Sequence, residues 1–286
     1  MTKLAIVYEL SDLFIKNREV KMSQAPVILY SDEYHQCMLF DELVTGDGIQ
    51  SNQFLILHQG KAALIDPGGD LTFSALSTGV SEYCDLSGLD FIFASHQDPD
   101  IISSLDQWLL QTPCKVVSSR LWARFLPHLV SRDDCDSIEG DVFDRIIAVP
   151  DEGMNIPVGN TIIQCLPAHF LHSVGNLNFY DPVSKILFSG DIGGSFGVGK
   201  GGEPVDNFSK HIPNMIGFHH RYMSSNKMCR LWADMIRKLD VEMIVPQHGR
   251  YFKGRIIINE FLDWISNLQC GIDLLTESDF QIPEQD

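Results

Sequence analysis

The sequence of 286 residues lacks any apolar run that approaches the roughly 20 residues needed to cross a bilayer. It also begins without the features of a secretory signal, because acidic residues interrupt the apolar stretch of MTKLAIVYELSDLFIK and no small-residue cleavage site follows. These absences argue against a membrane or secreted protein. We expect a chain that stays in the cytoplasm, without a membrane partner.

Positive charge is also scarce, with 21 Lys and Arg residues against 38 Asp and Glu residues and a net charge of −17. Such a chain repels phosphate backbones, so we expect no nucleic-acid partner. A small phosphate ligand held by metal ions is still compatible with this charge.

Cysteine pairs of the C-x-x-C type are absent, and the seven cysteines cannot all pair within one chain. This pattern predicts reduced thiols in a reducing compartment rather than a disulfide framework.

Short apolar runs bounded by turn residues predict a series of strands, with helical patterns between several of them. The strands are expected at QFLILH, KAALID, FIFAS, CKVVSS, RIIAVP, NTIIQCLP, KILFSG and EMIVPQH, and the helices at 105–110, in RLWARFLPHLV up to its proline, and in KMCRLWADMIRKL. Hairpin strands precede strand–helix alternation, and the whole pattern then recurs. The order favours a mixed α/β sandwich over a doubly wound parallel sheet. Residues 1–26 are expected to form an N-terminal extension to one domain over residues 27–286.

The segment FIFASHQDPDI predicts a buried strand that leads into His96, Asp98 and Asp100. Alternate positions on an extended loop let two of these side chains face one metal ion while the third reaches a second ion. The simpler interpretation is a turn around Pro99, which aspartates often make.

Three further strands end in the same way, at NTIIQCLPAHFLH, KILFSGD and EMIVPQHG. They supply His169 or His172, Asp191 and His248. Imidazoles and carboxylates are ligands for iron, zinc or manganese, and loops at strand ends are where a rigid sheet positions such groups. Four strand ends of this kind favour a metal centre over four unrelated turns.

The order H-x-D-x-D, His, G-D and Q-H-G resembles the metallo-β-lactamase superfamily, whose usual first motif is H-x-H-x-D-H. The similarity extends over about residues 27–265, including QSNQFLILHQGKAALIDPG and YMSSNKMCRLWADMIRKLDVEMIVPQHG. Within the superfamily it is strongest to flavodiiron proteins and oxygen-binding diiron proteins, which have a carboxylate at the position of Asp98. The resemblance implies a metallo-β-lactamase-type αββα sandwich.

The resemblance also implies roles for individual residues, with two iron ions as the cofactor and zinc or manganese as alternatives. His96, Asp98 and His172 would hold the first metal, Asp100 and His248 the second, and Asp191 would bridge them. We prefer His172 to His169 because its register matches the family, and His169 is then expected beside the ligands. Asp66, in ALIDPG, would support the histidine loop without touching the metal.

Two departures from the family pattern affect the expected function. Ile101 stands where a further histidine ligand often follows the second aspartate, so the second metal should have a more open coordination. No flavodoxin-like segment follows the resemblance, so we expect an external electron donor or a signalling partner. A homodimer is expected because flavodiiron proteins usually associate in this way.

The remaining histidines and the tyrosines carry weaker signals. His219 and His220 could line the mouth of the site, and Tyr180, Tyr222 and Tyr251 could donate hydrogen bonds to a metal-bound ligand. The other histidines are expected at the surface or in packing: His35, His58, His128 and His211. The glycine-rich segment 190–203 is expected to be a flexible lid, although its glycines and Lys200 could also cradle a phosphate.

The leading functional hypothesis is a non-haem diiron protein that binds dioxygen, either to sense it or to reduce it. A dinuclear metallohydrolase such as a phosphodiesterase is the main alternative, because paired metals also activate water. In a third possibility the site only stabilises a domain that signals to another protein.

Overall fold

The computed structural model describes residues 25–45, 47–131, 138, 140–197 and 200–283. The N-terminal extension expected at residues 1–26 lies almost wholly outside the described residues, and so does Cys135. The six described cysteines are free thiols, as expected. No helix in the described part of the chain is both long and apolar enough to span a bilayer.

A seven-stranded sheet forms the N-terminal half of the fold, with its strands in sequence order from β1 to β7. The first four strands form antiparallel hairpins, and β4 to β7 pair in parallel. The strands are β1 (Val27–Ser31), β2 (His35–Phe40), β3 (Gln53–His58), β4 (Lys61–Ile65), β5 (Leu89–Phe93), β6 (Lys115–Ser119) and β7 (Ile146–Val149).

A six-stranded sheet forms the C-terminal half, in the order β13-β12-β11-β10-β9-β8. Its strands pair antiparallel except for the parallel pair β11 and β12. The strands are β8 (Met154–Val158), β9 (Thr161–Pro167), β10 (Leu177–Asp181), β11 (Ile186–Phe188), β12 (Met243–Val245) and β13 (Phe252–Lys253).

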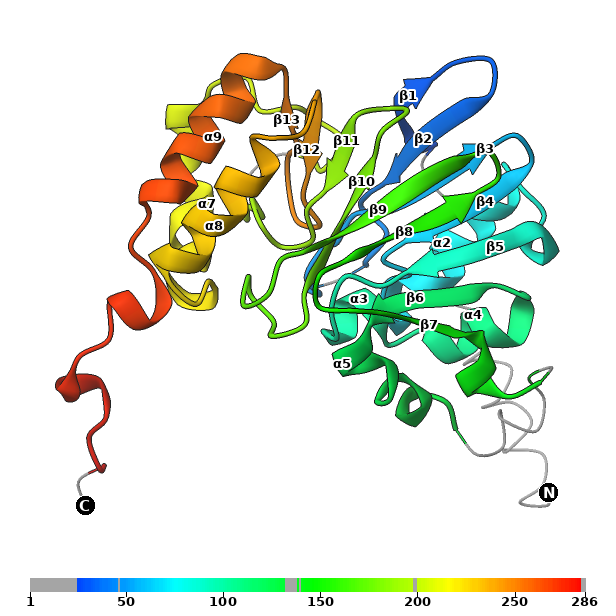
Figure 1. Cartoon of the computed structure of the whole chain (residues 1–286), viewed down its shortest axis with the longest axis horizontal. Coiled ribbons are helices and arrows are strands. Elements are labelled where there is room, and N and C mark those ends of the chain that lie inside the picture. Colours follow the sequence, from blue (N-terminus) through cyan, green and yellow to red (C-terminus); the bar gives the residue numbers. More distant parts are fainter. Residues whose placement is uncertain (1–24, 46, 132–137, 139, 198–199, 284–286) are drawn as a thin grey trace, which may run out of the picture.

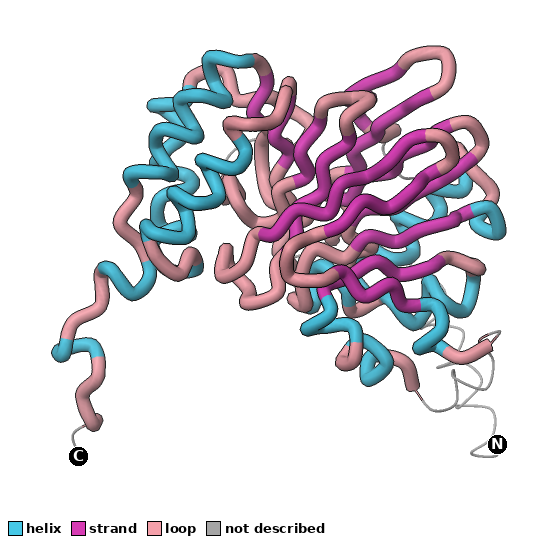
Figure 2. The backbone as a smooth tube through the Cα atoms, viewed as in Figure 1, coloured by secondary structure: helices cyan, strands magenta, loops and turns pink. Residues whose placement is uncertain are grey.

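The two sheets stack face to face, and helices cover their outer faces (Figure 1). Figure 2 shows the same arrangement, with the magenta strands enclosed between cyan helices. The seven-stranded sheet is covered by α2 (Asp70–Ser81), α3 (Pro99–Ile102), α4 (Leu105–Gln111) and α5 (Arg120–Ala123), and the six-stranded sheet by α7 (Phe208–Tyr222), α8 (Asn226–Ile236) and α9 (Arg255–Asn267). The expected αββα sandwich is therefore confirmed.

Apolar side chains fill the space between each pair of layers. Between the two sheets, the ring of Phe54 lies 5.0 Å from that of Phe188, and the rings of Phe93 and Phe179 are 5.2 Å apart. Tilted and edge-on ring pairs at this spacing stabilise a core beyond the area they bury. The sheets therefore form a rigid support for the loops at their edges.

The predicted strands all form, but one helix differs from its prediction. The segment RLWARFLPHLV is helical only over α5, and a 3₁₀ turn at Leu126–Leu129 then contains Pro127 near its start. Proline lacks an N–H and is tolerated in a first helical turn, so it separates the two short elements.

Candidate metal centre

Three candidate ligands lie on the loop that leaves the parallel strand β5. His96 follows the strand closely, and Asp98 is the residue that precedes α3, with Pro99 as the first helical residue. The Asp98 carboxylate does not cap this helix, so it is available to face the histidines. Asp100 lies in the first turn of α3.

The other candidate ligands come from the six-stranded sheet, at the same end of the sandwich. His172 lies between β9 and β10, Asp191 follows β11, and His248 follows β12. The strands β9, β11 and β12 run in one direction, so the chain leaves all three at one edge. A hydrogen bond from Leu177 N to the Ser95 carbonyl oxygen joins this edge to the β5 loop.

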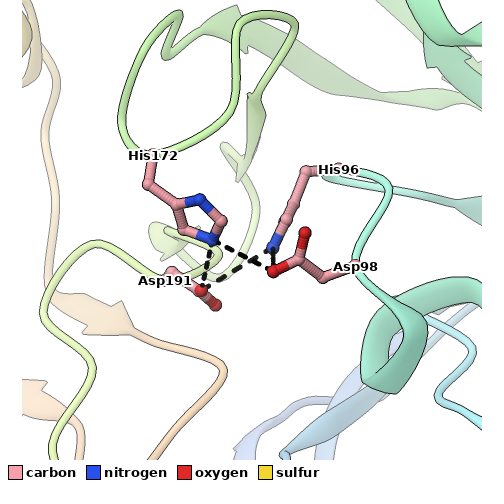
Figure 3. Close-up of side chains that lie close together, drawn as sticks. All are labelled: His96, Asp98, His172 and Asp191. Carbon is pink, nitrogen blue, oxygen red and sulfur yellow. Dashed lines mark ion pairs between the residues drawn. The ribbon is translucent and has the colours of Figure 1, made fainter. Parts of the chain in front are cut away.

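Four of the predicted side chains converge on one point, as Figure 3 shows. His96, Asp98, His172 and Asp191 place one ligand atom each within 4.8 Å of one another. His172 Nε2 is 3.0 Å from Asp191 Oδ2 and 3.3 Å from Asp98 Oδ2. His96 Nε2 is 3.7 Å and 3.8 Å from the same two oxygens.

The second oxygen of Asp191 faces a different histidine. His248 Nε2 lies 3.5 Å from Asp191 Oδ1 and 3.4 Å from Asp100 Oδ2. Asp191 therefore directs one oxygen at each group of side chains. This is the geometry that a bridging carboxylate requires.

The spacing of the donor atoms suits binding to a shared metal ion better than direct hydrogen bonding between them. Atoms bound to one ion at about 2.1 Å are themselves roughly 3.0–3.5 Å apart, close to the spacings found here. The buried atoms His96 Nε2, His172 Nε2 and Asp191 Oδ1 have no hydrogen-bond partner. Buried polar atoms without partners are rare in folded proteins and call for an explanation, which a bound cation would supply.

Hydrogen bonds at the far side of two imidazole rings leave Nε2 free to bind a metal. The Nδ1 atom of His248 lies 2.7 Å from the Gln50 carbonyl oxygen, which can only accept, so Nδ1 carries the proton. His96 Nδ1 lies 2.9 Å from Ser95 Oγ, which in turn donates to Asp66 Oδ2. The Nε2 atom of each neutral ring then presents its lone pair to the site.

Asp66 holds the β5 loop from beneath. It follows β4 with a positive φ of 53° and accepts hydrogen bonds from both the backbone N–H and the hydroxyl of Ser95. Burial raises the pKa of Asp66 to about 7, although the two hydrogen bonds oppose the shift. Asp66 thus reaches His96 through Ser95. The segment ALIDPG indicated Asp66 from the sequence. Nothing in the sequence singled out Ser95 or the Gln50 carbonyl group.

Charges in the centre are strongly coupled. Burial favours the neutral form of Asp191, but the surrounding histidines outweigh burial and lower the pKa of its carboxyl group far below the usual range. Burial likewise disfavours a charged His172, yet the carboxylates of Asp191 and Asp98 raise its pKa to about 9. The carboxylates of the site therefore stabilise a positive charge that lies between them.

An arch of aromatic rings joins the histidines of the two groups. Phe196 packs on His248 at 5.1 Å between ring centroids, and Phe218 lies 5.1 Å from Phe196. Tyr222 stacks on Phe218 at 4.6 Å and meets the edge of His172 at 5.4 Å. Sequence reasoning singled out only Tyr222 among these residues. Tyr180 instead donates to the Asp240 carbonyl oxygen, and Tyr251 is buried between the sheets.

His169 does not join the centre, whereas His172 does. His169 Nε2 lies 2.8 Å from the Asp151 carbonyl oxygen, and the described residues give it no hydrogen bond to any of the six candidate ligands. The structure thus places the His169 ring against the Asp151 backbone, and its position beside the ligands stays a prediction.

The described part of the glycine-rich segment, 190–197 and 200–203, makes several contacts that a free lid would lack. His219 is buried and accepts a hydrogen bond from Gly193 N, while its Nδ1 donates to the Met215 carbonyl oxygen, so it supports this loop from behind rather than lining the mouth. Ser195 N donates to the His248 carbonyl oxygen. Lys200 forms an exposed ion pair with Glu42 at 2.8 Å, so its ammonium group is directed at a carboxylate.

Ile101 explains why the second group is poorer in ligands. Its side chain is fully buried in the core between the seven-stranded sheet and its helices. The described part of the chain thus offers only Asp100, Asp191 and His248 around the second position.

The sandwich and the six converging side chains define a protein of the metallo-β-lactamase type. A family model described as ODP family beta lactamase matches residues 49–249, and the chain belongs to this family.

Solved structures with similar folds include two of a chemotaxis sensor named ODP. A peroxy diiron species of this sensor is 39% identical, covers 88% of this chain and 98% of that chain, and has a TM-score of 0.76. An apo state of the sensor from T. denticola is also 39% identical with a TM-score of 0.76, covering 87% and 96% of the two chains. A variant of a flavodiiron protein from Thermotoga maritima shares the fold at 19% identity and a TM-score of 0.65, and the match covers 84% of this chain and 61% of that one.

Among curated relatives, an uncharacterised protein of Methanocaldococcus jannaschii is 26% identical over 77% of this chain. The chain spans 54% of that relative and 32% of a putative diflavin flavoprotein of Synechocystis, which is 27% identical over 71% of this chain.

Proposed function

We propose that this protein is a non-haem diiron protein that binds dioxygen and acts as a sensor. The observation that carries the proposal is the position of Asp191, whose two oxygens face histidine Nε2 atoms on opposite sides. The likeness to a chemotaxis sensor that forms a peroxy diiron species supports iron and oxygen as the relevant chemistry.

Each candidate ligand has a defined role in this proposal. His96, Asp98 and His172 hold the first iron, Asp100 and His248 hold the second, and Asp191 bridges the two. Three histidines and three aspartates form a ligand set suited to iron, although zinc or manganese could also bind it. Iron, when bound, supplies the change of oxidation state that reaction with dioxygen needs.

The surrounding residues prepare the site for a small ligand. Ser95 and Gln50 fix which ring nitrogens of His96 and His248 face the iron. Phe196 and Phe218 place apolar surface beside His248 and so line one side of the site. Because Ile101 stands where a further histidine ligand could be, the second position would have fewer protein ligands and could accept dioxygen.

Sensing is favoured over oxygen reduction by the degree of similarity. The chain is 39% identical to the chemotaxis sensor but only 19% identical to the flavodiiron variant. A sensor must pass its state to a signalling partner, and reduction would require an external electron donor. Both partners and a homodimer are proposals that follow from the family relationship, and a cytoplasmic location is a proposal that follows from the expected reduced thiols.

Metal analysis tests the dinuclear centre. Protein produced in iron-rich medium and purified without oxygen should contain about two iron ions per chain, because six ligands exceed what one tetrahedral ion needs. One equivalent of iron or none in folded protein would overturn the proposal.

A further inference from the structure

A second cluster of metal-binding side chains lies at the opposite end of the sandwich from the candidate centre. His35 and Cys37 are alternate residues at the start of β2, so they point to the same face of the sheet. Asp181 ends β10 in the other sheet, and Ser184 lies in the turn that follows. All four side chains are buried.

The ligand atoms of His35, Cys37 and Asp181 all lie within 4.8 Å of one another, close enough for one ion to reach all three. His35 Nε2 is 2.7 Å from Asp181 Oδ2 and 3.3 Å from Cys37 Sγ, and Cys37 Sγ is 3.4 Å from Asp181 Oδ2. The Ser184 hydroxyl also donates to Asp181 Oδ2. One imidazole, one thiol, one carboxylate and one hydroxyl thus gather from two sheets.

The hydrogen bonds behind His35 aim its other ring nitrogen into the cluster. His58 Nε2 faces Asn160 Oδ1, which accepts a hydrogen bond, so His58 Nδ1 is left to accept from His35 Nδ1 at 3.0 Å. His35 Nε2 then faces the Asp181 carboxylate with a lone pair. Metal-binding histidines are typically oriented in this way, through a hydrogen bond from the ring nitrogen that does not bind the metal.

Charge gives an independent reason to expect a cation. Asp181 is fully buried, and no Lys or Arg among the described residues forms an ion pair with it. Val183 N, Ser184 N and the Ser184 hydroxyl donate hydrogen bonds to Asp181, so what the carboxylate lacks is a balancing positive charge and a partner for the His35 lone pair. Either a proton or a metal ion between His35 and Asp181 would supply both.

We propose that His35, Cys37 and Asp181, with the Ser184 hydroxyl as a fourth donor, bind a thiophilic divalent cation such as Zn²⁺. The thiol favours a softer ion than the histidine and aspartate set of the other centre. The residues are closed to solvent, so the ion has a structural role: it links β2 of one sheet to β10 of the other. Binding releases the Cys37 proton to solvent, because the thiolate is the metal ligand.

Titration with Co²⁺ distinguishes the two sites, because the cobalt absorption spectrum differs between them. The full chain is stripped of metal with a chelator and titrated with Co²⁺ alone, while the near-ultraviolet absorption is recorded. A thiolate-to-cobalt charge-transfer band should appear and reach its limit by three equivalents, one for this cluster and two for the other centre, because Cys37 is a ligand in this cluster. The candidate iron centre contains no cysteine and produces no such band, so the result is independent of the proposed function.

Matched cysteine variants identify which cysteine sulfur binds the cobalt ion. Cys37→Ser should abolish the band, whereas Cys165→Ser, at a buried thiol elsewhere between the sheets, should leave it unchanged. Absence of the band in the unaltered chain would overturn the proposal and indicate a shared proton instead, a result that stands even if Cys37→Ser fails to fold. A band that survives Cys37→Ser but disappears in Cys229→Ser would also overturn it, by placing the metal at the Cys229 and Cys270 pair.

Discussion

Among single residues, Asp191 has the largest expected effect on the metal centre, because both groups of ligands meet at its carboxylate. Asp191→Ala should remove or scatter both irons, since a bridging carboxylate is shared. Metal analysis of the purified variant measures the loss. His169→Ala is the control, because His169 contacts a backbone carbonyl group instead, and it should retain its iron. Loss of iron from the His169 variant but not from His172→Ala would reverse the choice of ligand.

Ser95 has a smaller expected effect, because it acts on iron only through His96. Ser95→Ala removes the hydroxyl that joins His96 Nδ1 to Asp66, so His96 is no longer held in the tautomer that binds metal. Iron affinity should fall about 10- to 100-fold, as for other groups that orient metal-binding histidines. Competition with a chromogenic chelator measures the change. Ser118→Ala is a matched control at another buried serine, and an equal loss there would show a general packing effect.

At the scale of elements, the centre depends on loops that keep unusual backbone angles. Gly249, directly after His248, has a φ of 74°, and a Cβ atom there would clash with the carbonyl oxygen and hydroxyl of Ser195. Ser195 N also donates to the His248 carbonyl oxygen, so a clash displaces this ligand.

Gly249→Ala should therefore weaken iron binding at the second position more than at the first. Gly254→Ala is the control, since Gly254 has a φ of 84° but open space around it. The control should cost only the strain of its backbone conformation, about 1–3 kcal/mol, with iron content preserved. Iron content and thermal melting of both variants check the expectation. Equal iron loss in the two variants would contradict a specific role for the His248 loop.

The elements also show what the sequence can and cannot predict. Periodicity and turn residues indicated the strands that end in ligands, because a buried strand followed by His or Asp is a local pattern. The pairing of His35 with His58 was not visible, because neighbouring strands bring together residues 23 positions apart. The aromatic arch was missed for the same reason, since Phe196 and Phe218 become neighbours only when α7 packs beside the glycine-rich loop.

For the molecule as a whole, metal ions should contribute to stability as well as to function. The net charge is −17, and the centre places Asp98, Asp100 and Asp191 close together. Removing iron with a chelator leaves this repulsion uncompensated. At free metal about a thousand times the dissociation constant, binding stabilises the fold by about 4 kcal/mol.

The melting temperature of the wild-type chain should therefore fall after chelation and recover when Fe²⁺ is restored. Asp191→Ala should melt at nearly the same temperature with and without the chelator, because it has little iron to lose. An unchanged melting temperature in the wild-type chain, with iron shown to be removed, would mean that the centre contributes nothing to folding.

The reaction with dioxygen tests the central claim most directly. Reduced, iron-loaded protein should develop visible absorption when oxygen is admitted, whereas zinc-loaded protein should not, since zinc cannot change its oxidation state. The same samples are assayed with bis(p-nitrophenyl) phosphate, a substrate for paired metals that activate water. A diiron oxygen-binding protein predicts the oxygen-dependent spectrum without rapid phosphodiester cleavage. An iron-loaded protein that is inert to oxygen but cleaves the phosphodiester rapidly would contradict the account and identify a metallohydrolase.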